Sequence, residues 1–204
     1  PDMHVLVTGH TGFKGAWLTL MLHRAGHRVS GLALDPEPGA LFETASLHDL
    51  TEHDIRGDVR DPAVVQHALA ATQPDAVMHL AAQPLVRESY ADPRWTMETN
   101  VLGTLNLLEA VSRTPSVRAH LVITTDKVYR NVRQVTGYVE PDALGGHDPY
   151  SASKAMADLL VQSWTVSFPG CPTAIARAGN VIGGGDLAED RLLPDLLRAF
   201  AHDQ

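Results

Sequence analysis

The chain has 204 residues, and its 24 acidic side chains outnumber its 16 Lys and Arg, which gives a net charge of -8. This balance argues against a nucleic-acid or anionic-membrane surface, and no apolar stretch is long enough to predict a transmembrane helix. The composition is that of a globular protein, and the single cysteine, Cys171, excludes an internal disulfide framework and suits a reducing compartment. We therefore expect a cytoplasmic protein.

Short apolar segments typical of strands alternate with amphipathic segments typical of helices. The predicted strands are 3–8, 27–34, 55–58, 76–80, 120–125 and 173–178. The predicted helices are 13–24, 41–50, 62–72, 95–113, 151–168 and 191–201. This alternation predicts an α/β fold, a doubly wound parallel sheet of the Rossmann type, as one domain without a flexible linker. In the first helix we expect an apolar face of Trp17, Leu18, Met21 and Leu22.

A glycine-rich turn joins the first predicted strand to the first helix. Its sequence has the spacing GxxGxxG and runs Gly9-His10-Thr11-Gly12-Phe13-Lys14-Gly15. Glycine permits the tight turn and a close backbone approach to a pyrophosphate, and the free N–H groups of the helix N-terminus suit an anion. No GK[ST] sequence follows, so the turn is not a P-loop. We predict a dinucleotide site, and the alternative is a glycine turn without a ligand.

Asp35 closes the second predicted strand, where a carboxylate can accept hydrogen bonds from the hydroxyls of an adenosine ribose. It would repel a 2′-phosphate, and the following Pro36 and Glu37 supply no arginine for one, so we expect NAD rather than NADP. The alternative for Asp35 is a loop residue before proline. Asp58 and Val59, after the third strand, are predicted to flank the adenine, although Asp58 also suits a turn.

Tyr150 and Lys154 form the pattern YxxxK, which places both on one face of a helix. We expect the Lys154 cation to favour the phenolate and to lower the pKa of Tyr150. Such a tyrosine can take a proton from a hydroxyl while hydride leaves its carbon, and Lys154 can also hold the nicotinamide ribose. Thr124 and Thr125 close the fifth strand at the carboxyl edge, and one of their hydroxyls is expected to orient the substrate against Tyr150.

These motifs, in this order, resemble the extended branch of the short-chain dehydrogenase/reductase superfamily, many of whose members are nucleotide-sugar epimerases and dehydratases. The resemblance spans essentially the whole chain and also includes Asn100. It implies that the NAD site also includes Leu80, Ala81 and Ala82.

Within this branch, five segments are similar to the CDP-glucose 4,6-dehydratase family. They are 9–15 (GHTGFKG), 81–86 (AAQPLV), 125–129 (TDKVY), 144–154 (LGGHDPYSASK) and 177–194 (RAGNVIGGGDLAEDRLLP). The similarity implies that Tyr150 removes the proton of the glucose C4 hydroxyl while hydride passes to NAD. Water is then lost across C5 and C6, and hydride returns to C6, so that CDP-glucose becomes CDP-4-keto-6-deoxyglucose.

The elimination needs a base at C5 and an acid at the C6 hydroxyl. The Asp126-Lys127 pair stands where the similar dTDP-glucose dehydratases carry Asp-Glu. We assign Lys127 as the base and Asp126 as the acid, and the two roles can also be swapped or shared through coupled titration. Lys127 can serve as a base near neutral pH only if its pKa is lowered. A salt-bridged turn is the structural alternative for the pair.

By the same resemblance, Gln83 and Asn180 are expected to contact the sugar nucleotide, and Arg191 its phosphates or cytidine. The histidines form no ligand set with Cys171, so we expect no metal site. Two residues depart from the family pattern, which commonly has Trp at the position of Leu187 and often has Glu at that of Arg130.

The chain has no starting Met and ends at Gln204, whereas family members continue into a smaller C-terminal domain that grips the nucleotide. We therefore expect residues 1–204 to be the NAD-binding domain with the catalytic residues, without the substrate domain. Helices 95–113 and 151–168 are apolar on more than one side, which predicts either tight wedging against the sheet or, as the resemblance implies, a homodimer through a four-helix bundle.

Three other functions stay open. A 4-epimerase of the same branch needs no acid–base pair at C5 and C6, so Asp126 and Lys127 count against it. Some UDP-amino-sugar dehydratases also carry a Lys-containing pair, which leaves nucleotide and sugar less firmly predicted than the reaction type. A non-catalytic dinucleotide-binding sensor would not need Tyr150 and Lys154, which are both present.

Overall fold

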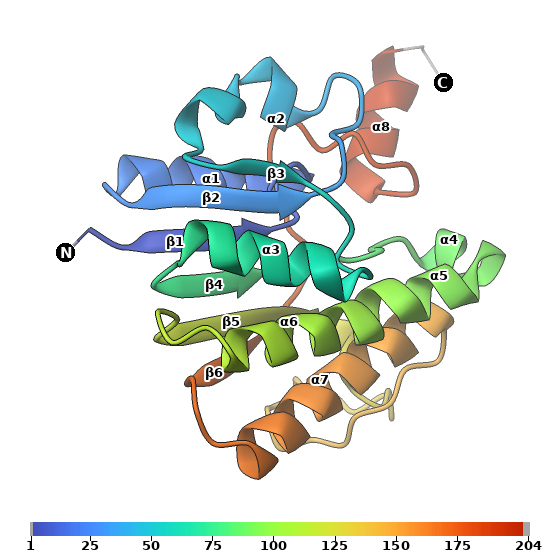
Figure 1. The fold of residues 1–204 in the computed structure, drawn as a ribbon. Helices are drawn as coiled ribbons and strands as arrows, with labels where there is room; N and C mark the ends of the chain where they lie inside the picture. Colours follow the sequence, from blue (N-terminus) through green and yellow to red (C-terminus); the bar gives the residue numbers. More distant parts are fainter. Residues whose placement is uncertain (1, 202–204) are drawn as a thin grey trace.

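A computed structural model describes residues 2–201 and shows a sheet of six parallel strands between helices (Figure 1). The strands are β1 (His4–Thr8), β2 (Arg28–Ala33), β3 (Asp54–Arg56), β4 (Ala76–His79), β5 (Ala119–Thr125) and β6 (Thr173–Ala178). Their order across the sheet is β3-β2-β1-β4-β5-β6, so the winding direction reverses beside β1. This order confirms the predicted doubly wound Rossmann-type sheet, in which ligands bind at the carboxyl ends of the strands.

The helices occupy the connections between the strands. They are α1 (Phe13–Arg24), α2 (Leu41–Thr44), α3 (Pro62–Thr72), α4 (Val86–Ala91), α5 (Pro93–Met97), α6 (Gly103–Ser112), α7 (Pro149–Ser167) and α8 (Leu192–Ala201). The chain also has three short helical turns: the 3-10 turns η1 (Leu47–Leu50), after α2, and η3 (Asp126–Val128), after β5, and the π-helical turn η2 (Glu98–Leu102), which joins α5 to α6. Helical structure is continuous through α5, η2 and α6, which confirms the predicted helix over 95–113, whereas the π-helical turn inside it and α4 were not predicted.

Three of these helices begin with the same pair, an Asp at the N-cap followed by Pro at the first helical position. Asp61, Asp92 and Asp148 each accept a hydrogen bond from a backbone N–H of the first turn, at 2.8, 2.9 and 2.8 Å. The aspartate satisfies an N–H that the helix leaves unpaired, and the proline ring already has the helical φ angle. This pair fixes where α3, α5 and α7 begin.

The main core fills one face of the sheet, beneath α3 and α6. Leu6 and Val77 of the sheet pack with Leu69 of α3 and Leu107 of α6. Further along the sheet, Val161 of α7 joins a second cluster with β5 and β6. These apolar contacts hold α7, which carries Tyr150 and Lys154, against β5.

Helix α1 covers the opposite face, and only half of its predicted apolar residues pack there. Leu18 and Leu22 contact the sheet, whereas Trp17 and Met21 are 37% and 64% exposed. The helix instead buries its small side chains, Gly15, Ala16 and Thr19. A Cβ atom at Gly15 would lie 2.0 Å from the carbonyl oxygen of Gly9, so the helix sits too close to the turn for larger residues on that side.

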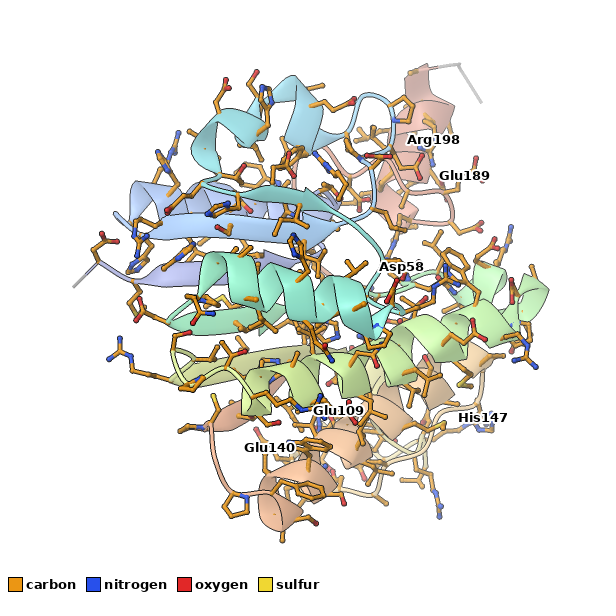
Figure 2. The ribbon with its side chains drawn as sticks, in the orientation of Figure 1. Asp58, Glu109, Glu140, His147, Glu189 and Arg198 are labelled. Atoms are coloured by element: carbon orange, nitrogen blue, oxygen red, sulfur yellow. The ribbon has the colours of Figure 1, made fainter. Side chains whose placement is uncertain are left out.

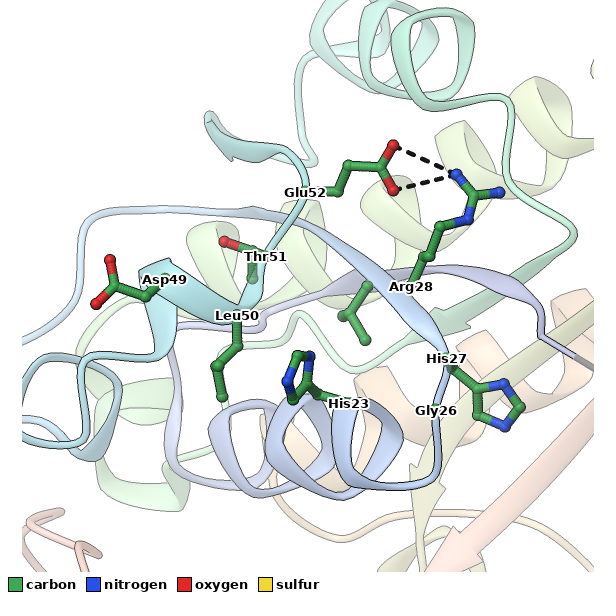
Figure 3. Close-up of a pocket in the computed structure, with 9 residues that line it drawn as sticks. His23, Gly26, His27, Arg28, Asp49, Leu50, Thr51 and Glu52 are labelled. Atoms are coloured by element: carbon green, nitrogen blue, oxygen red, sulfur yellow. Dashed lines mark hydrogen bonds and ion pairs between the residues drawn. The ribbon is translucent and has the colours of Figure 1, made fainter.

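A surface pocket of about 390 Å³ lies at the amino edge of the sheet, between the end of α1 and the start of β2 (Figure 3). Its lining includes His23 and the ion pair between Arg28 and Glu52, at 3.1 Å. None of the predicted site residues lines it.

Between residues 2 and 201, no helix has both the length and the apolar character needed to cross a membrane.

Candidate active site

The predicted site residues follow the carboxyl ends of the strands, at one edge of the sheet. The glycine turn follows β1, Asp35 follows β2, and Asp58, labelled at this edge in Figure 2, follows β3. Residues 80–82 follow β4, and 126–127 follow β5. The parallel topology thus gathers residues that are far apart in sequence, as the carboxyl-edge rule predicts.

The glycine turn has the shape that a dinucleotide site requires. Gly9 has a φ angle of +75°, and a Cβ atom there would lie 2.8 Å from the backbone nitrogen of Ala81. Gly12 stands at the N-cap of α1 without a side-chain hydrogen bond to the first turn, which leaves N–H groups of the helix N-terminus available to an anion. The hydroxyl of Thr11 donates to the carbonyl oxygen of Leu34 at 3.0 Å and joins the turn to the end of β2. These residues therefore fit a bound pyrophosphate.

Three cations lie around this turn. Lys154 is buried on α7, and its Nζ atom donates to the carbonyl oxygen of Ile123 at 2.9 Å. Burial, and then the charge of Lys14, lower the pKa of Lys154 to about 8. The pKa of Lys14 is itself lowered, first by burial and then by the charge of Arg191. Such mutual repulsion between cations favours the binding of an anion among them.

Tyr150 does not behave as the YxxxK pattern predicts. Its side chain is buried, and burial raises the pKa of the phenol above its ordinary value. The nearby Thr125 hydroxyl and the charge of Arg191 act in the opposite direction, toward a lower pKa. The expected lowering of the Tyr150 pKa is therefore wrong, because burial outweighs the opposing effects and Lys154 donates to a backbone carbonyl of β5 instead.

Thr125, Asp126 and Lys127 form a short arc at the end of β5. The Thr125 hydroxyl donates to Oδ1 of Asp126 at 3.1 Å and accepts from the backbone N–H of Lys127 at 3.4 Å. Asp126 and Lys127 are exposed, whereas Thr124 is buried and donates to Asp158 of α7 at 3.2 Å. Of the two threonine hydroxyls, that of Thr125 is therefore the one next to Asp126, whereas that of Thr124 faces α7.

A buried amide network joins the segment after β4 to η2 and to α7. The backbone N–H of Gln83 donates to Oδ1 of Asn100 at 2.9 Å, and Nδ2 of Asn100 donates to Oγ of Ser153 at 2.8 Å. Asn100 lies in the π-helical turn η2, a distortion that is frequent near functional sites. The Gln83 side chain is 1% exposed, and its amide bonds to Leu85 and Thr96. The predicted contact of Gln83 with substrate stays a prediction, and the side chain is occupied inside the protein.

The segment after β6 returns across α1. The indole N–H of Trp17 donates to the carbonyl oxygen of Gly184 at 3.0 Å. Asn180 is exposed at the start of this segment, and Arg191 is half-buried at its end, close enough to influence both Tyr150 and Lys14. The predicted substrate residues Asn180 and Arg191 thus lie on the segment that borders the glycine turn.

The three residues predicted to contact the adenosine, Asp35, Asp58 and Val59, differ in the exposure of their side chains. The carboxylate of Asp35 is 89% exposed. That of Asp58 accepts from Nε and Nη2 of Arg60, at 2.8 and 2.6 Å, and from its backbone N–H. Val59 is buried against Gly103. Asp58 therefore forms a turn with Arg60 and the Val59 side chain lies in the core, and the prediction that the two residues flank the adenine stays a prediction. Among residues 2–201, no three His, Cys, Asp or Glu side chains are grouped to hold a metal ion.

Comparison with known proteins assigns the chain to a family. Residues 5–204 match the NAD dependent epimerase/dehydratase family. The chain belongs to this family. It is 49% identical to the CDP-glucose 4,6-dehydratase of Salmonella typhimurium, over 98% of this chain and 58% of that protein.

Two solved structures show the same fold. A dTDP-glucose 4,6-dehydratase from Streptomyces venezuelae, with NAD bound, is 26% identical with a TM-score of 0.85, over 98% of this chain and 63% of that one. A UDP-glucose 4-epimerase from Thermus thermophilus, in complex with NAD, is 30% identical with a TM-score of 0.79, over 92% of this chain and 59% of that one. The chain thus spans less than two thirds of the length of these relatives.

Proposed function

We propose that the chain is the cofactor-binding and catalytic part of an NAD-dependent CDP-glucose 4,6-dehydratase. The observation that carries the proposal is the meeting of Thr125, Asp126 and Tyr150 beside the glycine turn, at the carboxyl edge of the sheet. The identity of 49% to the Salmonella enzyme supports the sugar nucleotide as well as the reaction. The single cysteine suits a cytoplasmic location.

The chain offers a continuous set of groups for NAD. The N–H groups after Gly12 would hold the pyrophosphate, the Asp35 carboxylate would accept hydrogen bonds from the adenosine ribose, and Lys154 would hold the nicotinamide ribose. When bound, NAD would supply a reversible hydride acceptor beside the sugar. Lys14 would place a positive charge near the same site.

Tyr150 and Thr125 would carry out the proton transfer at C4. Tyr150, as the phenolate, would take the proton of the C4 hydroxyl as that carbon becomes a ketone. The Thr125 hydroxyl has one proton, so it would donate to the phenolate in place of Asp126, which would partly offset the cost of burying that charge. Arg191 acts in the same direction through its charge.

Asp126 and Lys127 would then remove water from the ketone. The C4 carbonyl acidifies the proton at C5, which Lys127, as the neutral amine, would accept. Asp126, as the carboxylic acid, would give a proton to the C6 hydroxyl, which leaves as water while a double bond forms between C5 and C6. The exposure of both side chains at the mouth of the site allows them to reach a sugar, and the two roles can also be exchanged.

A 4-epimerase is the second candidate, because the Thermus structure at 30% identity is a UDP-glucose 4-epimerase. An epimerase returns the hydride to C4 and needs no acid or base at C5 and C6. The two ionisable side chains next to Thr125 therefore favour the dehydratase.

Two features of the whole protein belong to this proposal. Because the chain spans 58% of the Salmonella enzyme, the remainder would form a C-terminal domain that grips the nucleotide. Met156 and Leu159 of α7 and Leu102 of η2 are about half exposed, which supports a homodimer through a four-helix bundle of two such helix pairs. Sedimentation of the full-length protein would test the dimer.

The experiment that tests the function uses the full-length protein with NAD and, separately, CDP-, UDP-, dTDP- and GDP-glucose. Proton NMR follows the sugar. We expect the C6 hydroxymethyl signals to be replaced by a methyl signal with CDP-glucose. An unchanged sugar in all four reactions, with NAD still bound, would contradict the dehydratase and favour an amino-sugar substrate or a sensor.

A further inference from the structure

Arg56 holds a fixed position beside the adenosine end of the site. It is the last residue of β3 and pairs in register with Ala33 at the end of β2. Its Nη2 atom donates to Asp54 at 2.7 Å, and its Nη1 atom donates to the carbonyl oxygen of Leu34 at 3.3 Å. The guanidinium also lies over the ring of Phe42, 5.1 Å from its centre. These three contacts fix the plane of the guanidinium.

The nearest exposed anion is the predicted ribose acceptor. Nε of Arg56 lies 4.0 Å from Oδ1 of Asp35, whose side chain is 89% exposed, whereas that of Arg56 is 33% exposed. The Leu34 carbonyl that accepts from Arg56 also accepts from Thr11 of the glycine turn. The guanidinium therefore lies next to the group that would face the 2′ position of an adenosine ribose, with the carboxylate in the more exposed position.

We propose that Arg56 is a second determinant of the choice between NAD and NADP. Its guanidinium is placed to bind a 2′-phosphate, and the Asp35 carboxylate beside it prevents that binding. The inference rests on the proposed NAD site. A guanidinium is the side chain that best matches the planar, bidentate geometry of a phosphate. With Asp35 present, a dianionic 2′-phosphate meets the carboxylate first and is repelled, whereas ribose hydroxyls are accepted.

The charges around Arg56 allow this role. The Asp54 carboxylate contacts Arg56 through Oδ2 and the ring of the buried His10 through Oδ1, at 2.8 Å, so two partners already hold it and balance its charge. Asp35 is therefore the negative charge nearest to a bound 2′-phosphate that a substitution can remove. The proximity of Arg56 to Asp35 is not visible in the sequence, because the cation comes from the neighbouring strand rather than from the residues that follow Asp35.

The test is calorimetric titration of the chain with NAD and with NADP, which needs no turnover. We expect the unchanged chain to bind NAD at least about tenfold more tightly than NADP, the effect of roughly one unfavourable charge contact. Asp35→Ser should bring NADP binding to the level of NAD or above it. Asp35→Ser combined with Arg56→Gln should lose that gain, whereas Asp35→Ser combined with Arg28→Gln should keep it. Arg28 is a matched control, because it lies at the opposite end of β2 in an exposed ion pair.

Adenosine 2′,5′-bisphosphate and 5′-AMP serve as smaller probes of the same site, and thermal melts show whether each variant is folded. Arg56→Lys in the Asp35→Ser background should keep part of the gain if Arg56→Gln fails to fold, because it retains the charge without the planar fork. An Asp35→Ser variant that binds NADP no better than the unchanged chain overturns the inference, as does a gain that survives Arg56→Gln. If the unchanged chain binds neither NAD nor NADP, the proposed function itself fails.

Discussion

Arg177 of β6 donates from Nε and Nη2 to the two carboxylate oxygens of Asp158 on α7, at 2.8 and 2.9 Å. The Asp158 side chain is fully buried. Arg177 also donates from Nη1 to the Tyr129 hydroxyl at 3.0 Å, and its guanidinium lies over that ring. One ion pair thus joins the helix that carries Tyr150 to the segment that follows Asp126 and Lys127.

Breaking this pair should destabilise the fold. Burial acts to raise the pKa of Asp158, but hydrogen bonds from Arg177 and Gln162 outweigh it and hold the pKa below its ordinary value. Arg177→Gln leaves the buried carboxylate without its cation, and we expect a loss of about 3–5 kcal/mol in the free energy of unfolding, measured with urea. Arg118→Gln, which removes an exposed partner of Asp75, should cost less than about 1 kcal/mol.

The Arg177→Gln, Asp158→Asn double variant keeps this prediction testable if the single variant unfolds. It removes both charges, so it should recover part of the lost stability. Because the pKa of Asp158 is depressed, its contribution is present above its unfolded pKa and is lost as the pH falls through its folded pKa. An Arg177→Gln protein as stable as Arg118→Gln would contradict the account.

Lys154 should give a pH dependence of the same sign as Asp158, but in an alkaline range. Its folded pKa of about 8 is below its unfolded value, so the folded state binds fewer protons and stability rises as the pH increases from about 8 to 10. Lys154→Met removes the buried charge, and we expect the variant to be more stable at pH 7 by up to about 3 kcal/mol, with the difference closing near pH 10. Urea unfolding at both pH values checks this. A constant difference across the range would show that the titration of Lys154 does not contribute.

The phenol of Tyr150 should respond to Arg191. Arg191 lowers the pKa of Tyr150 against the larger effect of burial, so Arg191→Gln should raise that pKa further. The absorbance of tyrosinate, titrated with and without Tyr150→Phe, isolates this phenol. Arg198→Gln, which removes a cation from α8, is the control and should leave the titration unchanged. Equal titrations in both arginine variants would remove Arg191 from the proton transfer.

Asp126 and Lys127 should be separable from Tyr150 by the step that each variant blocks. Asp126→Asn and Lys127→Met should slow the formation of the methyl product by about 10²–10⁴-fold, typical of a lost acid or base. Both should still oxidise C4, so that reduced cofactor accumulates in a single turnover of the full-length protein with NAD. Tyr150→Phe should accumulate none. Methyl formation at the unchanged rate in both variants would contradict the roles of the pair.

Much of the fold follows from local patterns in the sequence. The bounds of α1 agree with the predicted 13–24, because a glycine turn and Gly26 mark its two ends. The Asp-Pro pair predicts the start of α3, and the same pair at Asp92 and Asp148 marks the starts of α5 and α7. These signals act within one helical turn, so they need no tertiary information.

The rest depends on contacts between distant residues. In the π-helical turn η2, Asn100 forms hydrogen bonds with Gln83 and Ser153. No local sequence pattern predicts these hydrogen bonds or the π-helical turn. The same network turns the Gln83 side chain inward. The raised pKa of Tyr150 results from burial beneath the completed fold, an effect that the YxxxK spacing does not contain. The proximity of Arg56 to Asp35 likewise requires the register of β2 and β3.

The central claim is that one active site oxidises C4 and reduces C6 of the same sugar. The most direct measurement uses the full-length protein, NAD and CDP-glucose that carries deuterium at C4. The account predicts a product whose C6 methyl group contains that deuterium, seen by NMR and by mass. Deuterium that stays at C4 of an intact or epimerised sugar, with no methyl group formed, would contradict it.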